Sequence, residues 1–310
     1  MRTLGLLLTA FLAAVALLSA GCFQRSEGQL GHASFAWTDC LFDCSVTDNP
    51  MAAAGAHAGM SISLANGYSF TQVRSSSSTV ASVALSGGNR LDLDVVSAAP
   101  GQTQVQLVDG SGKIVDQVAV TVTATARLAI TQGWSGAAPI VLEGSQQTFH
   151  VTTVDANDHT LIGTGAVTFE LTDPLAPGDV LTFGDSIAFS GHAGAGTITA
   201  HTPTASLVLP VTILPLTALT GLTATVQPNT TDSSGVYANV DVAANSASGD
   251  VYGAPCGWTV NDPSVAMQTQ TTATLEGAPK ASTKFLLKQP GTFSATCAIG
   301  AVSTTVSLTR

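Results

Sequence analysis

The sequence predicts an all-β chain of three β-sandwiches in tandem. Beyond residue 22 we find no convincing amphipathic helix of about ten residues or more. Short runs of β-branched and apolar residues recur instead, and Leu91–Val95 alternates strictly between apolar and polar residues, as a half-buried strand does. A strand that begins with glycine also recurs three times at a constant spacing. Such a repeat indicates one structural unit used several times.

Composition supports folded strands and excludes some partners. The chain is 45% hydrophobic and only 10% charged, with a formal net charge of −10. This hydrophobic content, together with the alternation, argues against disorder. The one concentration of basic residues is Lys280, Lys284 and Lys288, which we interpret as a solvated face. It is too sparse for a phosphate-binding surface, so no nucleic acid is expected as a partner.

The chain begins with the three parts of an export signal. Arg2 supplies a positive charge, Leu4–Leu18 is an apolar run, and Ser19-Ala20-Gly21 provides the small residues that a signal protease requires. The apolar run is short and lies at the N-terminus, which favours a signal over a membrane-spanning helix. Residues 1–21 are therefore expected to be a cleaved signal peptide.

The end of this segment resembles a bacterial lipobox, in which small residues precede a Cys that is lipidated and becomes the first residue of the mature chain. Cys22 is that residue here, although the lipobox prefers Leu where this chain has Ser19. The resemblance implies attachment to a membrane through a lipid on Cys22. Because Phe23 rather than Asp follows, lipoprotein sorting rules imply the outer membrane rather than the inner one. An ordinary secretory signal followed by an unmodified Cys is the alternative.

The other four cysteines are expected to form disulfides. Cys40, Cys44, Cys256 and Cys297 are an even set in an exported chain, where thiols oxidise. Local pairing is the simplest of the three connectivities that four cysteines allow. Cys40 and Cys44 also have a spacing compatible with a metal, but no second Cys/His pair at zinc spacing follows. No metal site is predicted.

The first sandwich is expected over residues 35–126, after a tether at 22–34. Its first strand is Phe35–Trp37, which leads into the Cys40/Cys44 loop, and residues 51–60 are interpreted as a further loop. Asp109-Gly110 has the chemistry of a hairpin turn. The remaining strands are expected at Ser61–Leu64, Tyr68–Val73, Val80–Leu85, Leu91–Val96, Val105–Val108 and Ile114–Thr123.

The second sandwich is expected over residues 127–215 and the third over 216–310. Pro210 and Pro215 bracket their junction and should interrupt strand pairing there. The second contains Thr148–Val154 and Ala166–Leu171 as strands, with a further pair between Gly196 and Ile213.

The repeat identifies the last two strands of each unit. Gly101, Gly196 and Gly291 are 95 residues apart, and each begins a strand. A final strand rich in Val and Thr follows each time, at Val118–Thr123, Leu207–Ile213 and Ser303–Leu308. This arrangement fits the last hairpin of an immunoglobulin-like sandwich.

Three segments resemble bacterial immunoglobulin-like (Big-type) domains. Ser77–Val83 and Asn261–Met267 are similar to the family's strand "Ser-Asp-Pro-Ser-Val-Ala-Thr-Val", and Val154–Gly163 is similar to its hairpin, with Asp158 where Gly is usual. The resemblance covers parts of residues 60–310 and implies immunoglobulin-like β-sandwiches. It implies little about activity, because sandwiches serve many functions.

Cys256, Trp258 and Cys297 invite comparison with the Cys/Trp/Cys core of antibody domains. The order differs, because in antibody domains the Trp lies well after the first Cys. Cys256 and Trp258 would share one face of a strand, so a bridge from Cys256 to Cys297 beside Trp258 is plausible. Closing a loop of about forty residues would contribute about 3–4 kcal/mol.

Ser186 lies in a segment similar to a catalytic block. Thr182–Ile187 resembles the sequence "Phe-Gly-Asp-Ser-Leu/Ile" of GDS(L)-type esterases, in which the Ser attacks an ester. That chemistry needs a general base and oxyanion donors. The family's Gly-x-Asn-Asp and late Asp-x-x-His are missing, since no His follows His201. An esterase using Ser186 is kept as the weaker alternative, and no catalytic residue is predicted.

Two further patterns are interpreted as structural. Asp155–Asp158 is faintly similar to a calcium loop, but Thr160 and Ala166 stand where Gly and Glu are required, so a turn capped by Asx side chains is preferred. The histidines are scattered without ligand spacing and are interpreted as surface residues; they are His32, His57, His150, His159, His192 and His201. No cofactor is predicted.

Aromatic residues leave a second function open. Each Trp or Tyr side chain could stack on a sugar ring, although packing in the hydrophobic core is the expected role of such residues. These residues are Trp37, Trp134, Trp258, Tyr68, Tyr237 and Tyr252.

The sequence as a whole predicts a lipid-anchored, non-catalytic protein of the cell envelope that serves as an interaction, adhesion or spacer module. A carbohydrate-binding surface protein is the first alternative. The ligand is expected to be a protein or a glycan.

Overall fold

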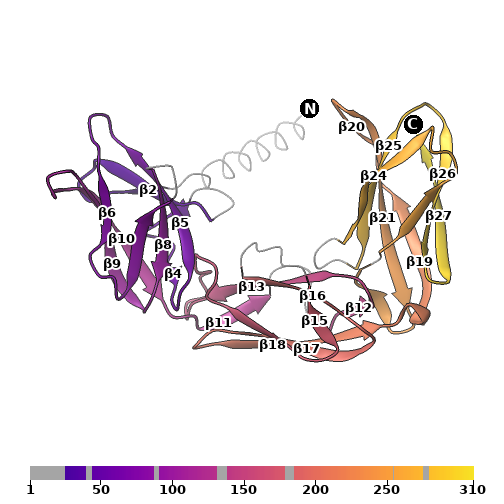
Figure 1. The fold of residues 1–310 in the computed structure, drawn as a ribbon, viewed down its shortest axis with the longest axis horizontal. Coiled ribbons are helices and arrows are strands. Elements are labelled where there is room, and N and C mark those ends of the chain that lie inside the picture. Colours follow the sequence, from indigo (N-terminus) through magenta and orange to yellow (C-terminus); the bar gives the residue numbers. More distant parts are fainter. Residues whose placement is uncertain are drawn as a thin grey trace, which may run out of the picture. The chain divides into compact units, whose positions relative to one another are not determined.

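The computed structural model describes residues 25–39, 44–86, 91–130, 138–178, 185–253, 255–274 and 279–310. Over these ranges the chain is built almost entirely of β-strands, with one short 3-10 turn at Leu216–Ala218 (Figure 1). The predicted all-β fold is confirmed. None of the helices in the described part is long and apolar enough to cross a membrane.

Two sheets share the first core. One has the order β1-β2-β5-β8-β7 with β3 on β2, and the other has the order β4-β10-β9-β6. Phe35 and Trp37 of the first sheet and Leu107 and Val120 of the second are fully buried in one cluster, so the sheets pack as a sandwich. The strands are β1 (Ser26–Glu27), β2 (Ala33–Trp37), β3 (Cys44–Ser45), β4 (Met51–Ala52), β5 (His57–Leu64), β6 (Gln72–Ser75), β7 (Ala81–Leu85), β8 (Asp92–Ser97), β9 (Gly101–Val108) and β10 (Ile114–Thr123).

Two four-stranded sheets follow along the chain. Their orders are β11-β13-β16-β15 and β12-β18-β17-β14. Phe149 of β13 and Ile198 of β17 are fully buried, because alternate residues of these two strands point inward. Phe189 of β16 is also fully buried, next to the buried Ala188. The strands are β11 (Arg127–Ile130), β12 (Ile140–Leu142), β13 (Gln147–Val154), β14 (Thr168–Leu171), β15 (Leu175–Pro177), β16 (Ser186–Gly191), β17 (Gly194–His201) and β18 (Ser206–Leu214).

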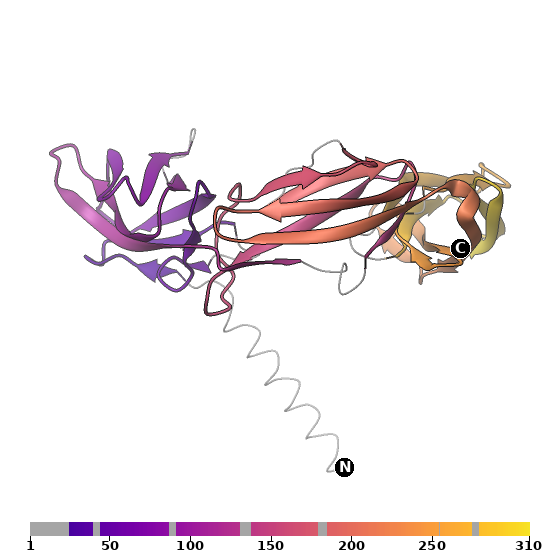
Figure 2. The same cartoon turned by 90° about the horizontal axis from the view of Figure 1, so that it is seen from below.

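The last two sheets share a second core. Their orders are β19-β21-β25-β24, with β20 and β22 on β21, and β23-β26-β27. Val240 and Phe285 of one sheet and Ala295 and Leu308 of the other are fully buried in one cluster. The strands are β19 (Leu219–Val226), β20 (Thr230–Asp232), β21 (Gly235–Ser246), β22 (Gly249–Val251), β23 (Gly257–Val260), β24 (Ala266–Thr274), β25 (Ala281–Leu287), β26 (Thr292–Ile299) and β27 (Val302–Thr309) (Figure 2).

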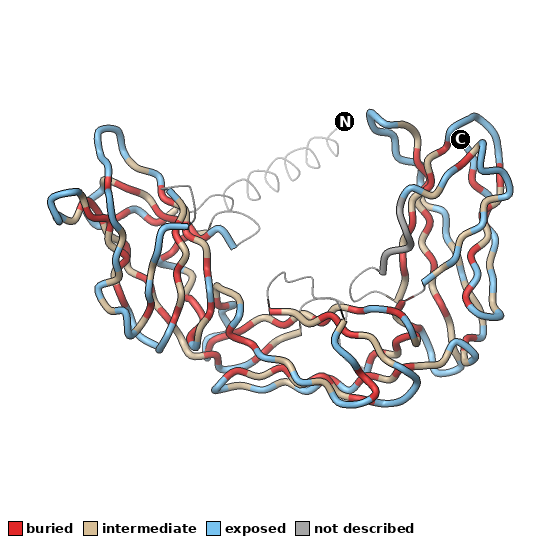
Figure 3. Tube along the Cα trace, in the orientation of Figure 1, coloured by how far each residue is buried: buried red, intermediate tan, exposed pale blue. Residues whose placement is uncertain are grey.

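Burial follows the alternation of the sequence. In β8 and β25 every second residue is buried and its neighbours are half-buried (Figure 3). The alternation of Leu91–Val95 predicted this pattern. It is confirmed for Leu93 and Val95, which are buried, whereas Leu91 precedes β8 and is 41% exposed.

The chain divides into two compact units. The first runs to Ala129 and adds Thr152–Thr168 and His201–Ser206, and the second comprises Ile130–Val151, Phe169–Ala200 and Leu207–Arg310. The three domain ranges 35–126, 127–215 and 216–310 stay a prediction.

Two of the segments similar in sequence fold alike. The backbone carbonyl of Ser77 accepts hydrogen bonds from the N–H groups of Val80 and Ala81, at 3.1 and 3.2 Å. The carbonyl of Asp262 accepts them from the corresponding residues, Val265 at 3.1 Å and Ala266 at 3.2 Å. In both places a strand begins at the alanine, which is buried.

The glycine repeat needs one correction. Gly101 begins β9 with φ +154°, and Gly291, with φ +140°, directly precedes β26. In the middle sheets the strand begins at Gly194, with φ +153°, two residues before Gly196. Positive φ is the conformation that requires glycine here. The constant spacing of 95 residues predicted Gly196 as the first residue of this strand, but the glycine with positive φ at its start is Gly194.

The predicted tether is also corrected. Of residues 22–34, those from 25 onward are described, and they are folded. β1 pairs with β2, with Ser26 opposite Phe35, and Ser26 is buried. The polar composition of this segment resembles that of a linker, but a buried partner further along the chain fixes it.

Candidate functional site

The buried residue that fixes the N-terminal segment is Asp116 on β10, which is fully buried. Its Oδ2 accepts hydrogen bonds from the backbone N–H groups of His32 and Ala33, both at 2.7 Å. Its Oδ1 accepts them from Leu30 at 2.9 Å and Gln117 at 2.8 Å. A buried polar group is costly unless it is hydrogen-bonded, and the three donors from Leu30, His32 and Ala33 hold the loop that leads into β2.

Two more residues secure the same loop. Gly28 passes so close to the Asp116 carboxyl group that a Cβ on Gly28 would overlap it. Arg25 donates from Nε to the Ser34 hydroxyl at 3.1 Å and from Nη2 to the Ser61 carbonyl at 3.2 Å. The chain is thus fixed to the first sheet from Arg25 onward.

Several predicted site residues lie outside the described residues. They include the signal peptide, the lipidation candidate Cys22, and Cys40. Lipid attachment stays a prediction. Cys44 begins β3 and is disulfide-bonded.

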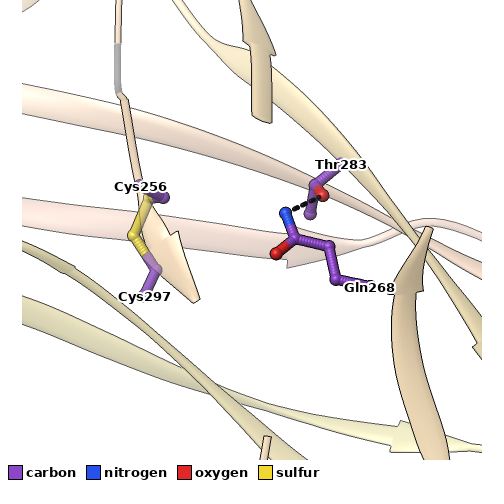
Figure 4. Close-up of a disulfide and its surroundings, with 4 residues drawn as sticks. All are labelled: Cys256, Gln268, Thr283 and Cys297. Carbon is purple, nitrogen blue, oxygen red and sulfur yellow. Dashed lines mark hydrogen bonds between the residues drawn. A yellow bond between two sulfur atoms is a disulfide. The ribbon is translucent and has the colours of Figure 1, made fainter. Parts of the chain in front are cut away.

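Cys256 and Cys297 form a disulfide with a Cα–Cα distance of 5.4 Å (Figure 4). Cys256 directly precedes β23, and Trp258 lies opposite Cys297 in the register of β23 and β26. The ring of Trp258 meets Phe285 of the facing sheet edge to face, with centroids 5.3 Å apart. The plausible bridge beside Trp258 is therefore present.

The position of this bridge differs from that in antibody domains. There the disulfide joins the two sheets, whereas here it joins neighbouring strands of one sheet. The bridge therefore stabilises the pairing within one sheet and does not connect the two sheets. On the facing sheet Gln268 donates to the buried Thr283 hydroxyl at 2.9 Å, and Figure 4 draws this polar pair among the surroundings of the disulfide.

Ser186 begins β16, and the residue directly opposite it on β13 is His150. Residues opposite each other in an antiparallel pair have Cβ atoms about 4.5–5.5 Å apart. Burial lowers the pKa of His150, so its imidazole is neutral at pH 7. The sequence did not predict this pair, because the esterase pattern has its His after the Ser and because the register of β13 and β16 brings His150 opposite Ser186.

The predicted Asx-capped turn is present at Asp155. The Asp155 Oδ1 accepts hydrogen bonds from the backbone N–H groups of Asn157 at 2.8 Å and His159 at 2.9 Å. The bond from His159 is the main reason why the pKa of Asp155 is lowered. Asp158 is on the surface and pairs with Arg127 at 2.9 Å. No cluster of three potential metal ligands is found in the described part of the chain.

Trp37 and Tyr237 are packed in the interior and so cannot stack on a sugar. Trp37 is fully buried and donates from Nε1 to the Asn49 carbonyl at 3.0 Å. Tyr237 is buried, and the Lys284 Nζ lies 3.9 Å from its ring centroid. Tyr68 differs, because it is 43% exposed.

Tyr68 is part of a surface groove on the first compact unit. Its ring stacks on His32, with centroids 3.9 Å apart and an interplanar angle of 15°. His32 is held in turn, because its Nδ1 lies 2.8 Å from the Val115 carbonyl oxygen. The groove has a volume of about 520 Å³ and is lined by Leu30, His32, Gly67, Tyr68, Ser69, Asp109, Lys113, Ile114 and Val115.

Charged groups from one hairpin turn complete the groove. The Asp109 Oδ1 accepts hydrogen bonds from the Ser111 hydroxyl at 2.7 Å and from the Lys113 backbone at 3.0 Å. The hydroxyl of Ser111, followed by these backbone donors, lowers the pKa of Asp109, which is therefore ionised at neutral pH. The residues that line the groove thus include an aromatic, an acidic and a basic residue.

Comparison with known proteins finds likeness among solved structures. No family model matches the chain, and no curated protein matches its sequence. Domains 4–9 of the surface layer protein SbsC are 18% identical over 83% of this chain, with a TM-score of 0.30, and the chain spans 42% of their length. Invasin, a bacterial integrin-binding protein, is 11% identical over 89% of this chain and 58% of its own, with a TM-score of 0.27. The D00–D0 domain of intimin is 11% identical over 59% of this chain and 98% of its own, with a TM-score of 0.24. No function is transferred at this level of similarity.

Proposed function

We propose that the protein is a lipid-anchored, non-catalytic module of the bacterial cell envelope that serves interaction, adhesion or spacing. The observation that carries this proposal is the attachment of the N-terminal segment to the first sheet. Only Phe23 and Gln24 separate the lipidation candidate Cys22 from Arg25, which is already hydrogen-bonded to the fold. A lipid on Cys22 would therefore hold the first sandwich directly at the membrane surface.

The use of polar groups supports a structural role. The side chain of Asp116 accepts hydrogen bonds from a loop, and that of Asp155 caps a turn. Asp262 accepts hydrogen bonds from the backbone N–H and the hydroxyl of Ser264, at 2.9 and 2.6 Å. Carboxylates that could otherwise serve as acids or bases thus stabilise loops. Loops at the ends of sandwiches offer surfaces for a protein or glycan ligand.

Replacing the anchor residue tests the proposal. The change Cys22→Ser should release the chain from the membrane fraction into the aqueous supernatant, because a single thiol carries the lipid. Fractionation followed by immunoblotting measures this, with Ser19→Ala as a control that keeps Cys22 and should remain membrane-bound. Unchanged membrane association of Cys22→Ser would contradict the anchor.

A second candidate function is supported by the pair of Ser186 and His150. A neutral imidazole next to a serine hydroxyl is one requirement for a nucleophile, and donors that stabilise the oxyanion are another. Turnover of p-nitrophenyl butyrate that is lost in both Ser186→Ala and His150→Gln would establish a hydrolase and overturn the non-catalytic proposal. We expect no such turnover.

A further inference from the structure

We propose that the groove formed by His32, Tyr68, Asp109 and Lys113 binds a neutral oligosaccharide. The inference rests on the proposed function, in which the protein presents a ligand-binding face in the cell envelope. It goes further by naming the site and the chemical class of the ligand.

The exposed tyrosine ring supplies the platform. One face of Tyr68 lies on His32, so the ring is held in place while 43% of the residue remains exposed. Leu30, which is 50% exposed, adds an apolar rim. An apolar face with polar edges matches a pyranose ring, whose C–H groups cover one face and whose hydroxyls surround it.

The polar groups of the groove match hydroxyls. The carboxylate of Asp109 can only accept hydrogen bonds, and the ammonium of Lys113 can only donate them. A sugar hydroxyl does both, so the hydroxyls of one sugar match both kinds of group. In the described residues no hydrogen bond to Asp109 Oδ2 is present, whereas Oδ1 is used by the turn.

Charge balance favours a neutral ligand over an anion. Asp109 is ionised and Lys113 carries the opposite charge, and among the described residues no other Lys or Arg lines the groove. A phosphate or sulfate group would meet the Asp109 carboxylate without a surplus of positive charge.

The site is rigid before a ligand binds. Asp116 fixes the backbone of His32, and the hydrogen bonds to Asp109 fix the turn that carries Lys113. The volume of about 520 Å³ lies in the usual range for small-molecule sites, about 300–1,000 Å³. Preorganisation lowers the entropic cost of binding.

The test is titration of the full chain with cellotetraose, maltotetraose, mannotetraose and chitotetraose, followed by saturation-transfer NMR and calorimetry. At least one should bind with a Kd of about 1 mM or tighter. Its affinity should change little between about 0.1 and 1 M NaCl, because the ligand carries no charge to screen.

Variants locate the binding. The change Tyr68→Ala should weaken binding at least about tenfold, whereas Tyr68→Phe keeps the ring and should stay within about threefold. Asp109→Asn keeps an acceptor for the turn and should weaken binding about fivefold. Leu216→Ala, on the second compact unit, is the matched exposed control and should leave the affinity unchanged.

Two results would overturn the inference. One is that none of the four sugars binds at about 10 mM. The other is that binding survives both Tyr68→Ala and Asp109→Asn. Neither result affects membrane release in Cys22→Ser, so failure of this inference is distinct from failure of the proposed function.

Discussion

At the scale of single residues, Asp116 is the group on which most of the N-terminal geometry depends. It is fully buried, and it holds three backbone N–H groups of the loop that contains His32. The same loop supplies one face of the groove, because His32 supports Tyr68. Stability and the candidate site therefore share one residue.

Removing this carboxylate should release the loop. The change Asp116→Ala leaves buried N–H groups without acceptors, which should cost about 3–5 kcal/mol of local stability. Gly28→Ala should act in the same direction through steric overlap with the carboxyl group. Hydrogen exchange of the Leu30, His32 and Ala33 amides measures the effect.

The control for this prediction is Asp48→Ala, at an exposed position of the same sandwich. It should change stability by no more than about 0.5 kcal/mol. Amide protection that is unaltered in Asp116→Ala would show that water replaces the carboxylate.

At the scale of elements, β21 shows how a charged pair stabilises the face of a sheet. Asp241 accepts hydrogen bonds from the Ser282 hydroxyl, from Lys280 Nζ at 3.1 Å and from Gln227 at 3.0 Å. Burial alone would raise the pKa of Asp241, but the bonds from Ser282 and Lys280 outweigh it and the pKa is lowered. The ionised form is therefore favoured by folding.

This shift predicts a pH dependence. Because the pKa in the folded state lies below that in the unfolded state, the stabilisation is present above about pH 4 and is lost as the pH falls through the folded-state value. Asp241→Asn should cost about 1–2 kcal/mol at pH 7 and much less near pH 3. Urea unfolding of both proteins at the two pH values measures the difference.

Asp232→Asn is the matched control for Asp241. Asp232 is half-exposed, and its Oδ2 lies 3.8 Å from the Lys284 Nζ. Loss of this exposed ion pair should therefore lower the free energy of unfolding by less than about 0.5 kcal/mol. An equal cost of Asp241→Asn at pH 3 and pH 7 would rule out the ionised carboxylate as its cause.

At the scale of the whole molecule, the described residues include two hydrophobic cores that share no residue, and we expect these two cores to unfold in separate events. One core is built around Phe35 and Trp37, and the other around Phe285 and Leu308. The disulfide between Cys256 and Cys297 lies in the second, where Cys297 is fully buried.

Removal of this disulfide should therefore affect one transition. The double change Cys256→Ser and Cys297→Ser opens a loop whose ends are 41 residues apart and should cost about 3–4 kcal/mol. Scanning calorimetry should show one lowered Tm, with the transition of the first core unchanged. Met267→Ala, at an exposed position on β24, is the control. A common shift of all transitions would contradict independent cores.

The sequence by itself determined the strands and several turns. Alternation placed β8, the Asp109 turn placed the hairpin of β9 and β10, and the spacing of Cys256, Trp258 and Cys297 made the disulfide plausible. These features depend on neighbours a few residues apart, or on cysteines that are expected to oxidise in an exported chain. The sequence therefore carries them directly.

Only the tertiary structure decided the contacts that make the candidate sites. Asp116 meets His32 from 84 residues away, Tyr68 stacks on His32, and His150 lies opposite Ser186. The pair of His150 and Ser186 depends on strand register, because a shift of one residue would turn a side chain to the other face of the sheet. The contacts of His32 depend on loops that the paired strands bring together. Register is set by the packing of the whole core, so local patterns could predict the strands but not these encounters.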